Sequence, residues 1–523
     1  MPASPTRNLL LATAFLLAVG AAAFGWFIDH GGFYSDDWAT AAIYRFAHAP
    51  RFWHAVVSES RLAGGRPVLA VVHPLPYALF GLHPALHLAL GVVLVVATCV
   101  CFYAVLRLLG LASLDAAAIA LLALLFPWAD SMELWPTASL NTIAVIFFFA
   151  GLSVALYGLN RAGTRGFVLH GVAAALYLLS ILTYEVAGAA AILVGALYVG
   201  RAPLRRALQF WAIDVVVVLG GLIFSLVRTS SVRHVGSLHD RASDLPHMTR
   251  DAIALAESAL LPFGRRTDVV HVLIGAVVVV AIAVLILRTV RGTRDRSSAW
   301  LVIGAGALVA IAAAYFMFLG STLHPLDPAT SNRLNVFARF AYAVLIYALL
   351  AAVAQLVAPT KRVGQTAALA IAGLIAVGYA VHLGHDESGW AKAARLQRNV
   401  LSVIDARFPR LDPGATVVTF GYPALVQPGA PIFYATWDFP GAVQLQHHDK
   451  RLSAVPVYET VELHCRPQRL VVRLPGSRGT ATPRYSKLFF LDVPSGHTSR
   501  IASAAACGSA IRRFRPGPYF AGA

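Results

Sequence analysis

The sequence predicts a polytopic α-helical membrane protein of about 11 transmembrane helices, with a C-terminal extracytoplasmic α/β or α+β domain. Hydrophobic residues make up 58% of the 523 residues and charged residues only 13%, and the mean hydropathy is +0.68. Soluble globular chains do not show this balance. Runs of about 18 or more nearly uncharged residues recur through the first three quarters of the chain. After residue 385 they give way to short apolar runs separated by Gly and Pro, which is typical of a small mixed domain.

The transmembrane segments are predicted from these apolar runs. They lie near residues 8–28, 84–106, 111–127, 139–158, 167–184, 186–200, 208–228, 267–288, 298–319, 336–357 and 365–384. The first run follows Arg7 and contains three alanines at 21–23, a pattern that also fits a cleavable signal peptide. We favour a retained anchor, because the apolar run continues to Ile28.

The basic residues indicate how the chain is oriented. The connector after each even-numbered segment is rich in Arg or Lys, which places these connectors in the cytoplasm by the positive-inside rule. They hold Arg107, Arg161, Arg165, Arg201, Arg205, Arg206, the cluster at 288–296, Lys361 and Arg362. The N-terminus is therefore expected in the cytoplasm and the C-terminus outside. The formal charge of +17 is explained largely by this pattern, and no nucleic-acid-binding motif accompanies it, so a nucleic-acid partner is not expected.

The predicted domains are a transmembrane part, 1–384, with a long first outer loop at 29–83, and a soluble outer domain, 385–523. Cys465 and Cys507 lie in the outer domain, where an oxidising compartment would permit a disulfide between them. Cys99 and Cys101 lie within a predicted span and are interpreted as packing residues. Arg greatly outnumbers Lys and Ala is abundant, which is typical of a GC-rich bacterial genome, so the expected location is the bacterial inner membrane.

The first outer loop opens with "GGFYSDDWAT" at 31–40, which places Asp36 and Asp37 side by side just beyond the first span. The simplest interpretation is a pair of solvated loop acids. However, Tyr34 and Trp38 flank the pair, and both residue types favour the membrane interface. At that depth a carboxylate can meet a lipid-linked phosphate sugar and take the proton of an attacking hydroxyl.

This arrangement resembles the GT-C membrane glycosyltransferases, which include protein O-mannosyltransferases, the lipid A aminoarabinose transferase and mycobacterial arabinosyltransferases. The resemblance rests on "YSDDW" at 34–38, its position after the first span, and "GGRPVLAVVHPLPYALFGLHPALHLAL" at 64–90. Sequence motifs support it over about the first hundred residues, and topology supports it over the rest of the membrane part.

The resemblance implies inverting transfer of a sugar from a polyprenyl-phosphate donor to a glycan, lipid or protein acceptor at the outer face. By position, Asp36 would be the catalytic base and Asp37 would orient the acceptor or the first carboxylate, or the two roles would be exchanged. Family members that use monophosphate donors generally need no metal, so no cofactor is expected, although a divalent metal is not excluded.

Other candidate substrate-binding residues are charged groups near the outer ends of spans. Arg66 can neutralise the donor phosphate or simply snorkel to the interface. Glu185, in "LTYEVAG", lies between two apolar runs, where a carboxylate usually faces a cavity or a partner. Glu133 is a weaker candidate, because a short outer loop tolerates acids.

The last outer loop, "STLHPLDPATSNRLNVFARF", supplies His324, Arg333 and Arg339. A departing phosphate gains negative charge and needs a cation beside it. Arg339 is favoured for this role because an unpaired Arg entering a span would be costly. Alternatively, all three are ordinary charged residues at the membrane interface with no role in binding. Arg233 and His234 are less specific candidates for the phosphate contact.

Two other classes remain open at this stage. A transporter or flippase for a lipid-linked saccharide would use intramembrane charges along a path, and would tolerate loss of Asp36 better than loss of Glu185 or Arg339. A glycan polymerase or ligase would depend on outer-loop Arg and His in place of the acidic pair.

Overall fold

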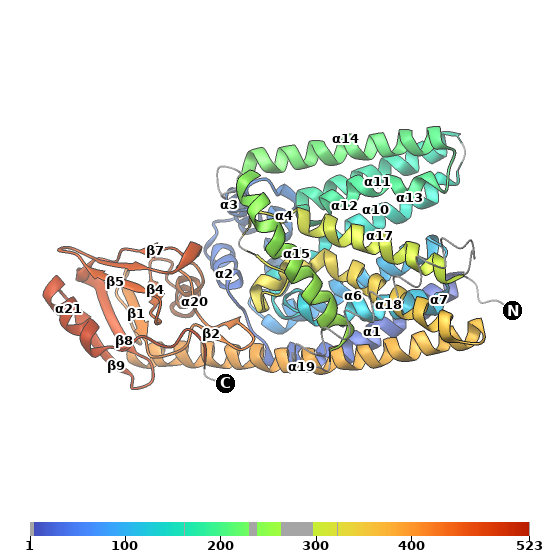
Figure 1. Ribbon diagram of the computed structural model, residues 1–523. Coiled ribbons are helices and arrows are strands. Elements are labelled where there is room, and N and C mark those ends of the chain that lie inside the picture. The colour runs from blue at the N-terminus through green and yellow to red at the C-terminus, as the bar shows by residue number, and fades with distance from the viewer. Residues whose placement is uncertain (1–4, 162, 230–237, 263–295, 322, 522–523) are drawn as a thin grey trace.

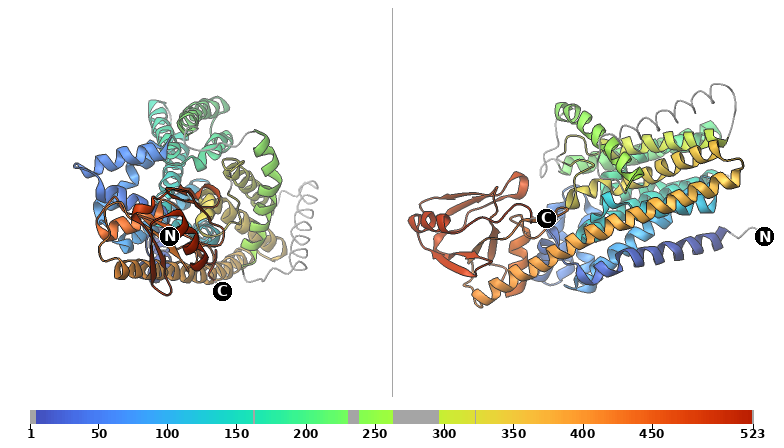
Figure 2. Two further views of the ribbon diagram at one scale, coloured as in Figure 1. Left: turned by 90° about the vertical axis from the view of Figure 1, so that its left-hand side faces the viewer. Right: turned by 60° about the horizontal axis from the view of Figure 1, so that its bottom comes forward.

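The computed structural model describes residues 5–161, 163–229, 238–262, 296–321 and 323–521. The chain forms a bundle of long helices and a strand-containing domain that adjoins one end of the bundle (Figures 1 and 2). Eight helical segments in the described residues are long and apolar enough to cross a membrane. They comprise α1 (Pro5–His30), α6 (Pro84–Leu108), α10 (Thr142–Leu159), α11 (Gly163–Thr183), α14 (Leu204–Thr229), α17 (Arg296–Phe316), α18 (Asn335–Val357) and α19 (Lys361–Arg407).

Two of the predicted spans form shorter apolar helices. The segment at 111–127 gives α7 (Ser113–Leu124), which ends before Pro127. Phe126 has extended backbone angles, as expected for a residue that precedes proline. The segment at 186–200 is divided among η2 (Glu185–Ala187), α12 (Gly188–Leu193) and α13 (Gly195–Val199). The predicted span at 267–288 lies outside the described residues.

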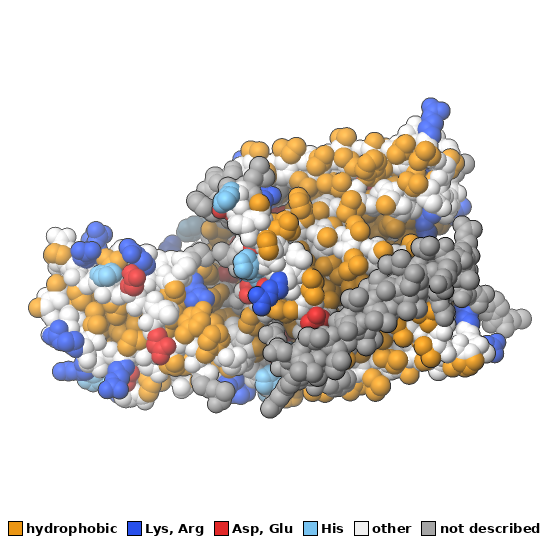
Figure 3. Space-filling model, viewed as in Figure 1, with side chains coloured by type: hydrophobic (Ala, Val, Ile, Leu, Met, Phe, Trp, Pro, Cys, Tyr) orange, Lys and Arg blue, Asp and Glu red, His pale blue; other side chains and the backbone are white. Residues whose placement is uncertain are grey.

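The Arg-rich connectors that the structure describes, after α6, α10, α13 and α18, gather at one end of the bundle, opposite the strand-containing domain (Figure 1). The cluster at 288–296 lies almost entirely outside the described residues. Arg201 donates hydrogen bonds to the carbonyls of Leu108 and Leu109, at the C-terminal end of α6. Arg206 donates to the carbonyl of Gly158, in the last turn of α10, and to that of Arg161, just after the helix. The cations thereby cap exposed helix C-termini, where positive charge is favourable. Figure 3 shows the apolar surface of the bundle between this end and the strand-containing domain.

Short helices fold over the opposite end of the bundle. The first outer loop forms α2 (Asp36–Phe46), α3 (Arg51–Ala63), α4 (Pro67–Val72) and α5 (Pro74–Phe80). The segment between α7 and α10, called the second outer connector below, forms η1 (Pro127–Ala129), α8 (Ser131–Leu134) and α9 (Pro136–Ser139). Further along the chain lie the amphipathic α15 (Leu238–Leu260) and η3 (Ala329–Leu334).

The C-terminal domain is built on a four-stranded sheet of order β4-β1-β8-β9. The central β1 (Thr416–Phe420) is parallel to β4 (Ser453–Pro456) and β8 (Leu488–Asp492), and β9 (His497–Ile501) pairs antiparallel with β8. All five residues of β1 are buried, which suits a strand covered on both faces. The predicted boundary at 384/385 falls within α19, which continues to Arg407 and joins the two parts as one helix.

Smaller elements complete this domain. They are β2 (Leu425–Val426), β3 (Ala430–Pro431), α20 (Asp438–His447), β5 (Glu462–Cys465), β6 (Leu470–Arg473), η4 (Gly476–Arg478), β7 (Thr480–Ala481), η5 (Tyr485–Lys487) and α21 (Ala504–Arg513). A disulfide joins Cys465 at the end of β5 to Cys507 in α21. It closes a loop with a sequence separation of 42, which restricts the unfolded chain.

The bundle contains a buried ion pair between α18 and α8. Arg339 and Glu133 are 0% and 2% exposed, and Arg339 Nη1 lies 2.6 Å from Glu133 Oε1. A charge at this depth is tolerated because the opposite charge is in direct contact. The pair therefore ties the second outer connector to α18.

We expect Arg339→Met to destabilise the protein by about 3–5 kcal/mol, because it leaves Glu133 buried without its partner. The measurement is thermal unfolding of the purified protein in detergent. The matched control is the double variant Arg339→Met with Glu133→Leu, which removes both charges and should recover most of the loss. A single variant that melts like wild type would contradict a structural role for the pair.

Candidate functional site

A cavity of about 300 Å³ lies where the outer loops meet the ends of the long helices. Four of the residues predicted for the site line it: Asp36, Arg66, Glu185 and Arg333. The other lining residues are Leu69, His73, Trp135, Thr137, Ala138, Asn141, Tyr184, Val186, Met317, Phe318, Ser321 and Leu323. The wall thus combines both signs of charge with aromatic and aliphatic side chains, as ligand sites commonly do.

The two adjacent aspartates have different environments. Ser35 turns the chain sharply, with φ of 46°, and α2 begins at Asp36. Successive helical side chains point about 100° apart, so the two carboxylates separate. Asp36 is half-buried on the cavity wall, whereas Asp37 is fully buried beneath it.

Asp37 anchors the first outer loop. Its Oδ2 accepts a hydrogen bond from the Tyr34 amide at 2.7 Å, and its Oδ1 accepts from the Thr137 amide at 2.7 Å and from the Thr137 hydroxyl. Its own carbonyl accepts from the Tyr77 hydroxyl at 3.0 Å. Burial raises the pKa of Asp37 to about 8, and the hydrogen bonds from Thr137 and Tyr34 oppose that rise. A carboxylate committed to these donors is poorly placed to take a proton from a substrate.

Asp36 has a smaller set of partners. Its Oδ1 accepts a hydrogen bond from the indole Nε1–H of Trp437 at 2.8 Å, and the Ser35 hydroxyl lies 3.5 Å from the same oxygen. No other hydrogen bond to this carboxylate occurs within the described part of the chain. Asp36 is therefore the member of the pair that can accept a proton from a molecule in the cavity.

Arg66 and Glu185 form an ion pair across the cavity wall. Arg66 Nε donates to Glu185 Oε2 at 2.7 Å, and Arg66 Nη2 donates to Glu185 Oε1. The guanidinium carbon lies 4.3 Å from the centroid of the Tyr184 ring. Burial lowers the pKa of Arg66, but the Glu185 carboxylate outweighs burial and raises it overall. The pair joins the first outer loop to the start of η2 and places two opposite charges beside the cavity.

Arg333 is the lining cation that has no carboxylate partner among the described residues. It lies in η3, where its Nη1 donates to the Thr330 carbonyl at 2.5 Å. Its guanidinium carbon is 5.7 Å from the centroid of the Trp135 ring. A guanidinium with most of its donors uncommitted can bind a phosphate through several hydrogen bonds.

Arg339, the cation favoured from the sequence, is placed elsewhere. It is fully buried against Glu133 and does not line the cavity. As expected for an arginine that enters a span, Arg339 has a partner, but this partner is a protein carboxylate. Arg233 and His234 lie outside the described residues.

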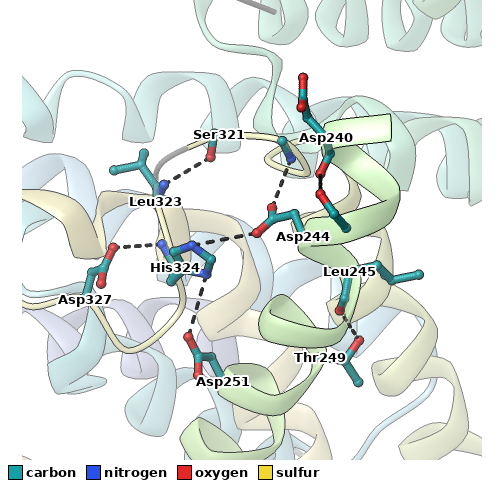
Figure 4. A network of polar contacts seen from close by, with 11 residues as sticks. Asp240, Asp244, Leu245, Thr249, Asp251, Ser321, Leu323, His324 and Asp327 are labelled. Atoms are coloured by element: carbon teal, nitrogen blue, oxygen red, sulfur yellow. Dashed lines mark hydrogen bonds and ion pairs between the residues drawn. The ribbon is translucent and has the colours of Figure 1, made fainter. Parts of the chain in front are cut away.

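His324 belongs to a network between α15 and the segment that follows α17 (Figure 4). Its Nε2 lies 3.7 Å from Asp244 Oδ1, and its Nδ1 lies 3.7 Å from Asp251 Oδ2. Asp244 also accepts a hydrogen bond from the Gly320 amide at 3.0 Å. These contacts attach α15 to a segment that contributes Ser321 and Leu323 to the cavity wall, but His324 itself does not line the cavity.

Several functional candidates were missed from the sequence. Trp437 and Thr137 contact the acidic pair, and Trp135 and Tyr184 lie against the two lining arginines. The only sequence signal was the aromatic character of the outer loops. No local pattern connects Trp437 with Asp36, since 401 positions separate them.

No group of three or more His, Cys, Asp and Glu side chains in the described ranges is arranged to hold a metal ion. The expectation that catalysis needs no metal remains a prediction.

We expect Asp37→Asn to lower stability by about 1–3 kcal/mol, because an amide NH₂ would meet donors that now bind a carboxylate oxygen. Thermal unfolding in detergent measures the change. Asp36→Asn is the matched control and should melt like wild type, since its amide oxygen can still accept from Trp437. Equal melting temperatures for the two variants would contradict a structural role for the Asp37 carboxylate that the Asp36 carboxylate does not share.

Comparisons with known proteins add little to this description. No protein-family model matches the chain, and no curated protein matches it. Among the solved structures that match is the crystal structure of ArnT from Cupriavidus metallidurans bound to undecaprenyl phosphate. It has 16% sequence identity, a TM-score of 0.36 and coverage of 86% of each chain. This likeness is too distant to define a family, so a functional assignment depends on the residues of the cavity itself.

Proposed function

We propose that the protein is a membrane glycosyltransferase of GT-C type, which moves a sugar from a polyprenyl-phosphate donor to an acceptor hydroxyl at the outer face of the bacterial inner membrane. The observation that carries the proposal is the joint presence, in one cavity, of Asp36, a carboxylate with one strong donor, and Arg333, a guanidinium without a carboxylate partner among the described residues. The resemblance of "YSDDW" and of the first outer loop to the GT-C enzymes supports it.

The proposed reaction assigns each charge a task. Asp36 takes the proton of the acceptor hydroxyl as its oxygen bonds to the anomeric carbon. The bond from that carbon to the phosphate oxygen breaks on the opposite side, so the configuration inverts. The electron pair remains on the polyprenyl phosphate, and Arg333 stabilises the added negative charge.

The remaining wall residues fit a polar sugar next to a lipid chain. Glu185 and Arg66 offer hydrogen-bonding groups, although each is already engaged with the other. Tyr184 and Trp135 provide aromatic faces, and Leu69, Met317 and Phe318 provide apolar surface. The side of the cavity toward the long helices would receive the first isoprene units.

The first experiment uses the purified protein in lipid with a panel of polyprenyl-phosphate sugars. We expect wild type to consume at least one donor, and Asp36→Asn to lower kcat by about 10²–10⁴-fold, the usual contribution of a general base. The product's anomeric configuration, read by NMR, should be opposite to the donor's. Donor binding without turnover in both proteins would instead indicate a transporter or flippase.

A second experiment tests the phosphate contact. Arg333→Gln should reduce kcat/KM for the donor by about tenfold to a hundredfold, since a hydrogen-bonded charge contributes roughly 1.5–3 kcal/mol. Arg333→Lys should restore part of the activity, because it keeps the charge without the planar fork. Arg451→Gln is the control, since Arg451 is an exposed partner of Asp449 on the C-terminal domain. An equal loss in the control would argue against a specific phosphate contact.

A further inference from the structure

The C-terminal domain contacts the candidate base directly. Trp437, just before α20, donates its indole N–H to Asp36 Oδ1 at 2.8 Å. The two helices that begin at these positions, α2 and α20, pack against each other. A Cβ on Gly441 would lie 2.5 Å from the Trp38 carbonyl oxygen, so only glycine permits this approach. The contact is thus part of a close interface between the domain and the first outer loop.

The segment that carries Trp437 is fixed by its own domain. The Asp438 carboxylate accepts hydrogen bonds from the amides of Tyr434, at 3.1 Å, and Ala435, at 3.2 Å. The Arg478 carbonyl accepts from the Thr436 amide at 3.0 Å. The Arg478 guanidinium carbon also lies 4.9 Å from the centroid of the Tyr434 ring. Both sides of Trp437 are therefore held, which limits the positions that its indole can adopt.

A second, weaker contact lies in the same interface. The Tyr434 hydroxyl lies 3.2 Å from the Ser35 hydroxyl oxygen, next to Asp36. Ser35 itself is 3.5 Å from Asp36 Oδ1, which is a weak hydrogen bond. Among the described residues, the indole N–H is the one strong donor to the Asp36 carboxylate.

An indole N–H donates but cannot accept, so Trp437 cannot itself remove a proton. It is not among the residues that line the cavity. It can act only through Asp36, by holding Oδ1 and thereby fixing the direction in which Oδ2 is presented. A base held within a narrow range of orientations transfers protons more effectively than a freely rotating one.

We propose that Trp437 is a positioning residue for the Asp36 carboxylate, so that the C-terminal domain completes the catalytic site of the membrane part. This inference rests on the proposed function, because it assigns Asp36 the role of base. Under this proposal the C-terminal domain helps to orient the catalytic base, whether or not it also covers the cavity.

The kinetic test compares wild type with Trp437→Phe in lipid, using whichever donor wild type turns over. We expect kcat at saturating donor to fall about tenfold to a hundredfold, as for the loss of one hydrogen bond to a charged group. KM for the donor should stay within about twofold and the melting temperature should be retained, because phenylalanine keeps most of the packing.

The matched control is Tyr434→Phe. It removes the hydroxyl that contacts Ser35, in the same interface, but leaves the donor to Asp36 in place. It should keep kcat within about twofold of wild type. If Tyr434→Phe lowers kcat as much as Trp437→Phe, the effect belongs to the interface in general, and the specific role of Trp437 is overturned.

A spectroscopic measurement tests the contact without turnover. The chain has nine tryptophans, and selective ¹⁵N labelling of their indoles gives one resonance each, with Trp437 assigned from Trp437→Phe. Asp36→Ala removes the acceptor and should shift the Trp437 indole resonance more than any other. An unmoved Trp437 resonance would overturn the inference.

The two levels of the proposal fail differently. If Asp36→Asn abolishes turnover but Trp437→Phe has wild-type kcat, the inference fails and the proposed function stands. If Asp36→Asn leaves turnover unchanged, Asp36 is not the base and the inference fails, although the protein is still a transferase. If wild type itself turns over no donor, the proposed function fails, and the inference fails with it.

Discussion

The arrangement of the segments around the cavity depends on the buried carboxylate of Asp37. It collects the Tyr34 amide and both donors of Thr137, and so joins the start of α2 to α9. Taking a carboxylate out of water is costly unless its oxygens are hydrogen-bonded, and here three donors offset part of that cost. Once Asp37 is held in this way, the helical turn after Ser35 brings Asp36 to the cavity wall. One aspartate thus positions the loop, and its neighbour remains available for chemistry.

The arginines near the cavity also divide into those that hold the structure together and one that is available to a ligand. Arg339 is fully buried against Glu133, and Arg66 is held by Glu185 and Tyr184. The first pair ties α8 to α18 and the second ties the first outer loop to η2, and their charges are largely neutralised locally. Arg333 lies over the Trp135 ring and has no carboxylate partner in the described residues. A charge that the protein does not neutralise itself can attract an anionic ligand, and a phosphate suits the guanidinium geometry.

The C-terminal domain is integrated with the membrane part at two places. The helix α19 runs without a break from the far end of the bundle into the domain, so the domain cannot rotate freely about a linker. Gly389 in α19 allows the Gln427 carbonyl to approach so closely that a Cβ would lie 2.0 Å from it. The interface between α2 and α20 provides the second attachment. Together they explain how a hydrogen bond between residues 401 positions apart can hold its geometry.

The sequence by itself determined the membrane class, most of the spans, the gathering of the basic connectors and the acidic pair in the first outer loop. These features are local, since hydropathy, charge and residue order act over about 20 residues or fewer. Tertiary structure alone decided which aspartate is buried, which lining arginine has no carboxylate partner among the described residues, and that Trp437 contacts Asp36. The sequence pointed to Arg339 as the phosphate contact because an arginine in a span needs a partner. It could not reveal that the partner is Glu133, more than 200 positions away. Burial and pairing depend on contacts between distant segments, and these exist only once the chain has folded.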